Sequence, residues 1–206
     1  EELKFTSDGQ IQAFRFGVSI SVAGDTVVIG APETLVDGNP NQGAAYVYVH
    51  SGGLWTEQAT LVASDGAVGD LFGSSVAISQ DLIVVGSPDD NAALGATYIF
   101  SRTSTIWTEA QKIVSSDGVA GDAFGHSVAL SGETVIVGAP FNSNQTGAAY
   151  VFVRGTTNWA EQAKLNAGIA GDQLGQAVDV DNDTAVVGAI VGNQAWIFDR
   201  SGSNWT

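Results

Sequence analysis

The stretch FGHSVALSGETVIVGAP at residues 124–140 decides the fold, because related stretches occur four times along the chain. The other three are FGVSISVAGDTVVIGAP from Phe16, FGSSVAISQDLIVVGSP from Phe72 and LGQAVDVDNDTAVVGAI from Leu174. Each contains two runs rich in Val or Ile separated by a short polar turn, which is typical of a β-hairpin. Recurrence at a period of about fifty residues indicates one structural unit used four times.

Each of these stretches is followed by a variable loop and two further strand-like runs. The run after the loop reads GAAYVYV from Gly43, GATYIFS from Gly95, GAAYVFV from Gly147 and AWIFD from Ala195. A Trp follows each of them, at Trp55, Trp107, Trp159 and Trp205. Four antiparallel strands in a repeat of this length form one blade of a propeller. The sequence therefore predicts an all-β fold, a four-bladed β-propeller of four-stranded antiparallel blades.

The whole chain, residues 1–206, is predicted to be a single propeller domain. Its blades are expected at about 16–64, 72–116, 124–166 and 174–206 plus 1–7. The last blade is split because the chain ends in NWT and begins EELKFTSDG, and the joined ends resemble WTEAQKIVSSDG from Trp107. We expect residues 1–6 to pair beside Trp205 and close the ring within one chain. Two chains forming an eight-bladed ring would satisfy the same pattern.

The first strand of each repeat alternates large and small side chains. Large apolar residues such as Val128 and Leu130 should pack between blades, whereas the small residues between them, such as Ser127 and Ala129, suit inner strands crowded around a narrow axis. Phe16, Phe72, Phe124 and Leu174 are expected in the core, together with the four repeated tryptophans.

The composition excludes several classes of function. The formal charge of −15 disfavours binding to nucleic acid or to anionic membranes. The chain has no Cys, which excludes disulfides, thiolate metal sites and Cys nucleophiles, and it has no apolar run long enough to span a membrane. Glycosylation sequons begin at Asn144, Asn182 and Asn204 and are compatible with secretion.

The Phe-Gly opening, the V-x-V-G-A-P close and the G-A-A-Y-V-F strand resemble the FG-GAP repeat. That resemblance covers essentially the whole chain and implies the propeller of integrin α-chains and of many secreted microbial and algal proteins. It also implies extracellular adhesion and calcium bound in an Asp-rich loop between the first two strands of a blade. Three repeats here have a short hairpin at that place, and the fourth reads Asp179-Val180-Asp181-Asn182-Asp183.

Two groups of acidic residues are candidate sites. The loops before the second and third Phe-Gly carry the candidate ligand-binding residues Asp65, Asp70, Asp117 and Asp122. Their carboxylates either bind a cation or ligand or hold their own loops as Asx turns. The candidate metal ligands are Asp179, Asp181 and Asp183, of which Asp179 replaces a small residue of the inner strand. Calcium is the expected cofactor if any is bound.

No set of residues in the repeats assembles a nucleophile, a base and oxyanion donors, so we do not expect an enzyme. The preferred function is an extracellular recognition or adhesion module that binds a protein partner through its loop-bearing face. A carbohydrate-binding lectin and a structural subunit of an extracellular assembly are the alternatives, and self-association is left open. The sequence names no ligand.

Overall fold

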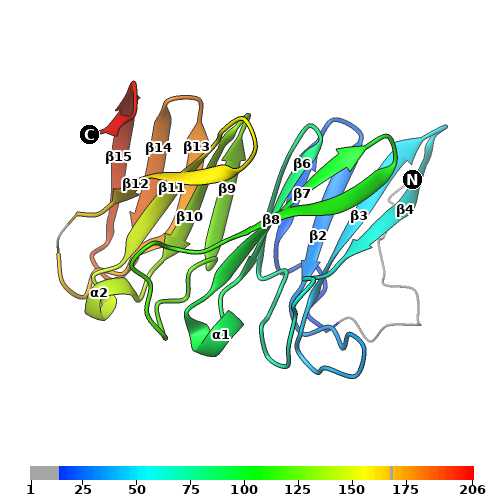
Figure 1. Ribbon diagram of the computed structural model, residues 1–206, viewed down its shortest axis with the longest axis horizontal. Coiled ribbons are helices and arrows are strands. Elements are labelled where there is room, and N and C mark those ends of the chain that lie inside the picture. Colours follow the sequence, from blue (N-terminus) through cyan, green and yellow to red (C-terminus); the bar gives the residue numbers. More distant parts are fainter. Residues whose placement is uncertain (1–13, 168) are drawn as a thin grey trace.

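The computed structural model describes residues 14–167 and 169–206. Its strands form four four-stranded antiparallel sheets, and in each sheet the strands follow one another in chain order (Figure 1). This confirms the predicted fold class, four propeller blades of four antiparallel strands each.

The four blades have closely similar strand bounds. The first contains β1 (Ile20–Ala23), β2 (Thr26–Ala31), β3 (Ala44–Ser51) and β4 (Leu54–Leu61). The second contains β5 (Ser75–Ser79), β6 (Leu82–Ser87), β7 (Ala96–Thr103) and β8 (Ile106–Ile113). The third contains β9 (Ser127–Ser131), β10 (Thr134–Ala139), β11 (Ala148–Arg154) and β12 (Trp159–Leu165). The fourth contains β13 (Leu174–Asp181), β14 (Thr184–Ala189), β15 (Gln194–Ser201) and β16 (Asn204–Trp205).

The first hairpin of every blade closes through a two-residue turn, as the sequence predicts. In the third blade Ser131 pairs with Thr134, and the turn begins at Gly132 with a φ of 55°. In the fourth blade Asp181 pairs with Thr184, and Asn182 has a φ of 53° at the equivalent position. Left-handed backbone at this position matches the right-handed twist of the two strands, and Gly and Asn tolerate it best.

The hydrophobic core lies between neighbouring blades. The side chains that face the following blade, such as Ile136 and Val151, pack against the next sheet in one cluster with Leu174, Val180 and Val187. Equivalent clusters join the first blade to the second and the second to the third. Phe72 and Phe124 are fully buried in these clusters and Leu174 almost so. We call the side of a blade that faces the next blade its forward face and the other its backward face.

The small residues of the inner strands lie on the forward faces and contact the next inner strand directly. Ser19 Oγ accepts a hydrogen bond from the Val76 amide at 3.0 Å, and Ser127 Oγ donates to the Gly175 carbonyl at 2.8 Å. Ala129 is buried in the cluster between the third and fourth blades. Small side chains are therefore needed because neighbouring inner strands approach closely, and both sets of alternating residues take part in blade packing.

The first and fourth blades lie at opposite ends of the array (Figure 1). On the backward face of the first blade Ile20 and Val22 are 70% and 65% exposed, whereas their equivalents Val76 and Ile78 are 6% and 7% exposed at an interior junction. The predicted pairing of residues 1–6 with the last blade lies outside the described residues. Within the described part of the chain, the blades form an open array rather than a closed ring.

The forward face of the fourth blade is open as well. Val186 and Ile197 are 39% and 66% exposed, whereas their equivalents Ile136 and Val151 are fully buried in the third blade. The difference arises because, among the residues that the structure describes, the third blade is covered by a neighbour and the fourth is not.

Candidate functional site: the loop-bearing face

Two sets of loops meet on one face of the array. The links between blades contain Asp65 and Asp117, and they hydrogen-bond to the loops between the second and third strands of the preceding blade. For example, the amide of Leu71 donates to the Asn41 carbonyl at 3.0 Å, and the amide of Ala123 donates to the Ala93 carbonyl at 2.9 Å. The short helical turns α1 (Asp90–Ala93) and α2 (Asn142–Gln145) lie on this face (Figure 1).

At the second blade, a four-residue polar network ties these loops to the sheet. The Tyr98 hydroxyl lies 2.7 Å from Asp65 Oδ1 and 2.9 Å from Asp90 Oδ2, and its single proton is shared between these two acceptors. Lys112 Nζ lies 2.8 Å from both Asp65 Oδ2 and Asp90 Oδ2. Asp90 is 5% exposed. A buried carboxylate requires such partners, and here it has a cation and a hydroxyl donor.

The charges of this network shift the pKa values of its members. Burial raises the pKa of Asp65, but the hydrogen bonds from Lys112 and Tyr98 outweigh it, so the pKa of Asp65 is lowered. Burial lowers the pKa of Lys112, but the same two carboxylates outweigh it and raise that pKa. Burial and the hydrogen bond to Asp65 raise the pKa of Tyr98 far above its ordinary value. Asp65 is therefore ionised and Tyr98 neutral at physiological pH.

The third blade repeats the network with one substitution. The Tyr150 hydroxyl donates to Asp117 Oδ1 at 2.7 Å, and Lys164 Nζ lies 2.6 Å from Asp117 Oδ2. Asn142 replaces Asp90, and its Oδ1 accepts a hydrogen bond from Lys164 at 2.8 Å. The hydrogen bonds from Lys164 and then Tyr150 lower the pKa of Asp117.

The fourth repeat lacks the same residue types. Trp196 stands where the third blade has Tyr150, and Ala167 stands where it has Asp117. In the first blade Thr60 replaces the lysine. Within the described residues the complete network therefore belongs to the two middle blades.

Asp70 and Asp122 stabilise the same loops through hydrogen bonds to backbone amides within each loop. Asp70 Oδ2 accepts a hydrogen bond from the Ala67 amide at 2.6 Å, and Asp122 Oδ2 accepts one from the Val119 amide at 3.0 Å. Asp122 also accepts a hydrogen bond from the Asn142 side chain at 2.7 Å. Both residues are buried, and burial raises the pKa of Asp70. Both carboxylates therefore bind backbone amides of their own loops, but each bond runs to the amide three residues before the aspartate, whereas an Asx turn uses the amide two residues after it.

Asp179, Asp181 and Asp183 lie on the first hairpin of the fourth blade, and their side chains are engaged separately. Asp179 Oδ1 accepts a hydrogen bond from the Val180 amide at 2.9 Å, and Asp183 Oδ1 lies 2.6 Å from Arg200 Nε. Among residues 14–167 and 169–206, no three His, Asp or Glu side chains gather in a group that could hold a metal ion. This arrangement does not fit the calcium loop that the resemblance implies.

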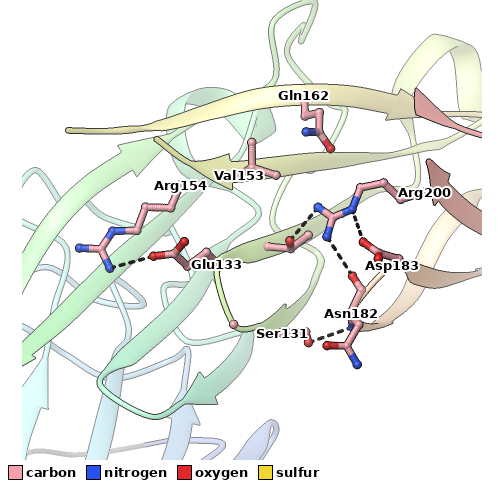
Figure 2. A pocket seen from close by; sticks show the side chains of 10 residues that line it. Ser131, Glu133, Val153, Arg154, Gln162, Asn182, Asp183 and Arg200 are labelled. Atoms are coloured by element: carbon pink, nitrogen blue, oxygen red, sulfur yellow. Dashed lines mark hydrogen bonds and ion pairs between the residues drawn. The ribbon is translucent and has the colours of Figure 1, made fainter. Parts of the chain in front are cut away.

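The opposite face, which carries the tight hairpins, has a cavity at each blade junction. Figure 2 shows the one between the third and fourth blades, with a volume of about 480 Å³. Arg200 reaches Asp183 at 2.6 Å and the Thr134 hydroxyl of the preceding blade at 3.1 Å. Arg154 lies farther along the same face and meets Glu133 at 3.8 Å. Arg102 bonds to the first blade as Arg200 bonds to the third, so these two arginines join neighbouring blades.

Sequence reasoning placed Asp65, Asp70, Asp117 and Asp122 in one kind of loop, and the structure shows them on one face. It missed the partners of these aspartates, above all Tyr98, Lys112 and Asp90. A signal was present: Lys112 and Lys164 occupy the same position after the repeated Trp, each in a repeat that also has the tyrosine and the loop aspartate.

The strands, junctions and loops together define the chain as a propeller-blade repeat protein. The FG-GAP repeat family matches residues 1–48, 55–100, 107–152 and 159–204, and the chain belongs to that family. It is 31% identical to integrin alpha-2 of Mus musculus over 46% of this chain and 9% of the relative. It is 34% identical to integrin alpha-11 of Homo sapiens over 50% of this chain and 10% of the relative.

A third relative, integrin alpha-6 of Gallus gallus, is 29% identical over 62% of this chain and 13% of its own length. The chain thus spans about a tenth of the length of these curated relatives. In the part of the chain that the structure describes, no helix is long and apolar enough to cross a membrane.

Proposed function

We propose that this chain is an extracellular, non-catalytic recognition module that binds a protein partner through its loop-bearing face. The observation that carries the proposal is a set of exposed apolar side chains on the loops of that face. They are Leu35, Val68, Val119, Phe141, Ile169, Ile190 and Val191. Val68 and Val119 are 62% and 61% exposed, beside the anchored Asp65 and Asp117. Apolar side chains rimmed by polar groups are typical of protein-binding surfaces.

The loops are also held in a fixed and strained form. In α1 three consecutive residues, Asn91, Ala92 and Ala93, have φ values of 50°, 60° and 59°. Non-glycine residues seldom adopt this left-handed backbone, and strain of this kind concentrates at functional sites. Asp90, bonded to Tyr98 and Lys112, anchors the turn at its base. A loop ordered before binding loses less conformational entropy when a partner docks.

The charge of the chain favours a partner with a basic surface. The side chains of Asp65 and Asp117 are 53% and 50% exposed, so each anchored carboxylate still faces solvent along one edge. With a formal charge of −15, the chain attracts cationic surfaces and accelerates their association. In this proposal Asp65 and Asp117 form the ligand-binding rim, while Asp70 and Asp122 shape the loops beneath it.

The relatives support an extracellular adhesion role, and because the chain covers a small part of each, that role stays a proposal. The lectin alternative is less well supported, because the repeated Tyr98 and Tyr150 rings are fully buried and offer no platform to a sugar. Calcium is not required by the proposal, since the loops are held by lysine, tyrosine and backbone groups.

The test compares two equally exposed positions on opposite faces. Val119→Asp alters the loop-bearing face, and Ile106→Asp, at a residue 66% exposed on the hairpin face, is the matched control. Both variants and the parent chain are immobilised and probed with purified extracellular proteins and with a glycan array, each with calcium and with chelator. We expect saturable binding of a protein that V119D weakens at least about tenfold and I106D leaves unchanged.

Each other result has a defined meaning. Binding to glycans alone would establish the lectin alternative. An equal loss of protein binding in both variants would show that the binding site does not lie on the loops. Loss of protein binding in chelator would show that calcium assists. Absence of binding in every arm would overturn the recognition function.

A further inference from the structure

Two of the three interior blade junctions use the same set of contacts, while at the junction of the second and third blades the Gln111 side chain bonds the backbone of Trp159 instead. At the junction of the first and second blades, Arg102 donates to the Thr26 hydroxyl at 3.2 Å and Trp107 Nε1 donates to Gln58 at 2.8 Å. At the junction of the third and fourth blades, Arg200 donates to the Thr134 hydroxyl at 3.1 Å and Trp205 Nε1 donates to Gln162 at 2.9 Å. A forward face and a backward face thus form two matching halves of one interface.

The open ends of the array carry one half each. The forward end face of the fourth blade comprises Ala177, Asp179, Thr184, Val186, Gly188, Ile197 and Asp199. The backward end face of the first blade comprises Phe16, Gly17, Ile20, Val22 and His50, whereas Ile29 and Tyr46 on the same side of the sheet are already buried. Val22, Ile197 and Ile20 are 65%, 66% and 70% exposed. At the interior junctions the equivalent side chains, Val76, Ile78 and Val151, are all covered by a neighbouring blade.

Each open end has a glycine at a position where, at the interior junctions, the backbones of two blades approach closely. A Cβ atom at Gly138 of the third blade would lie 2.0 Å from the Gly175 carbonyl of the fourth, so that junction requires glycine. Gly188 occupies the same position on the forward end face, where its nearest neighbour would be 3.6 Å away. Gly17 is the counterpart of Gly175 on the backward end face, and a Cβ there would meet nothing within 4 Å. Both ends therefore keep the glycine that a junction needs, although among the described residues no neighbouring blade approaches it.

The two end faces also complement each other in polarity. Asp179 stands at the position of Ser21, whose Oγ accepts a hydrogen bond from the amide of Ile78 in the next blade at 3.2 Å. The residue equivalent to Ile78 on the backward end face is Val22, so the Asp179 carboxylate can accept from its amide. Asp199 replaces a neutral residue of the other blades, and His50 replaces the arginine that crosses an interior junction. An acidic and a basic group would thus meet at the new junction.

We propose that the forward end face of one copy docks on the backward end face of a second copy, and that two copies close an eight-bladed ring. A contact between two different faces closes into a ring when the rotation allows it, and in a dimer it occurs twice. Two copies of four blades give eight, within the range in which four-stranded blades form propellers. Closure covers both apolar ends and the Asp179 carboxylate together.

One position departs from the interior pattern. Asn193, with a φ of 51°, stands where Gly147 of the third blade would bring a Cβ into contact with the Leu174 carbonyl. The new junction is therefore wider near this loop than the interior ones. Asn193→Gly removes the obstacle and is expected to tighten the dimer.

The first test measures mass against concentration by light scattering coupled to size exclusion. The parent chain is expected at twice its 21.1 kDa mass, and Val22→Glu at the mass of one chain. Leu54→Glu is the control, because Leu54 is 67% exposed and its equivalent Ile106 stays 66% exposed beside a neighbouring blade. The control is expected to remain a dimer. A parent chain of single mass at every concentration, or an open-ended series of larger masses, would overturn the proposal.

The second test separates a two-chain ring from closure within one chain. The chain has no Cys, so Val22→Cys and Asp179→Cys proteins can be prepared separately, mixed and oxidised. We expect a disulfide-linked pair containing one of each variant. The variant that carries both cysteines is expected to form disulfide-linked dimers as well. An internal disulfide within one chain would instead show that the chain closes on itself and would overturn the proposed two-chain ring.

Discussion

The hydroxyl of Tyr98 lies 2.7 Å from Asp65 Oδ1, and this hydrogen bond joins the third strand of one blade to the loop that enters it from the preceding blade. Tyr150 and Asp117 form the same pair at 2.7 Å one repeat later. In both blades a lysine of the outermost strand binds the second carboxylate oxygen. The position of the loop-bearing face and the stability of the blades are therefore linked through the same few side chains.

Replacing Tyr98 by Phe is expected to destabilise the protein. The change keeps the packed ring and removes the hydroxyl whose single proton is shared between Asp65 and the buried Asp90. We expect a loss of about 1 to 3 kcal/mol in the free energy of unfolding, measured by urea titration. Thr108→Val is the control, because its exposed hydroxyl makes a longer hydrogen bond of 3.4 Å with the Ser101 carbonyl. Equal effects of the two changes would contradict a special role for the Tyr98 network.

The ion pair at Asp117 predicts a dependence of stability on acid. The hydrogen bonds from Lys164 and Tyr150 hold the folded pKa of Asp117 below its ordinary value of 3.8. The stabilisation is complete above that value and is lost as the pH falls through the folded pKa. Thermal melting between pH about 5 and 2 should therefore decline less steeply in Asp117→Asn than in the parent chain. Asp181→Asn removes the same charge from an exposed hairpin and should keep the parent slope.

Burial lowers the pKa of His126, although Gln176 and Asp89 raise it in part. Because the folded state then binds its proton less readily than the unfolded state, stability should fall as the pH drops below the ordinary value of 6.5. An NMR titration of the two histidine rings, assigned with His126→Gln, should place the midpoint of His126 below 6.5. A midpoint at or above that value would show that the side chain is less buried in solution.

Two arginines at equivalent positions should differ in importance. Arg200 contacts Asp183, the Asn182 carbonyl and the Thr134 hydroxyl of the preceding blade, and its side chain is 18% exposed (Figure 2). The side chain of Arg154 is 48% exposed and meets Glu133 at 3.8 Å. Arg200→Lys is expected to lower the free energy of unfolding by about 1 to 2 kcal/mol, and Arg154→Lys by less than about 0.5 kcal/mol. Chemical denaturation measures both, and the reverse order would contradict the bridging role of Arg200.

Gly138 and Gly188 form a matched pair for the packing of blades. Gly138→Ala places a methyl group against the Gly175 carbonyl and should cost about 1 to 3 kcal/mol or more, because two backbones must separate. Gly188→Ala meets no such obstacle within one chain and should change the unfolding free energy by less than about 0.5 kcal/mol at concentrations where the chain is monomeric. A large effect of Gly188→Ala under those conditions would show that the ring closes within one chain.

The sequence by itself determined the blades, because the residues of each repeat specify its strands and turns locally. Alternating apolar residues, two-residue turns such as Gly132-Glu133 and the repeated Phe and Trp positions specify four hairpin pairs without reference to distant contacts. The family, most of the core residues and the common location of the four loop aspartates followed from the same repetition, while the predicted core residues of the first and fourth blades, Phe16, Trp55 and Trp205, are only partly buried.

Tertiary structure decided what those aspartates do and how the ends are left. Whether Asp65 is a free ligand or an anchor depends on Tyr98 and Lys112, which lie 33 and 47 residues away and meet it through blade packing. Likewise, Asp179 is exposed because, within residues 14–167 and 169–206, no blade covers the forward face of the fourth sheet, and the local sequence pattern does not reveal this. The repeated sequence pattern is enough to specify a blade. The partners of a side chain and the closure of the array depend instead on distances between blades, which are set only when the blades pack.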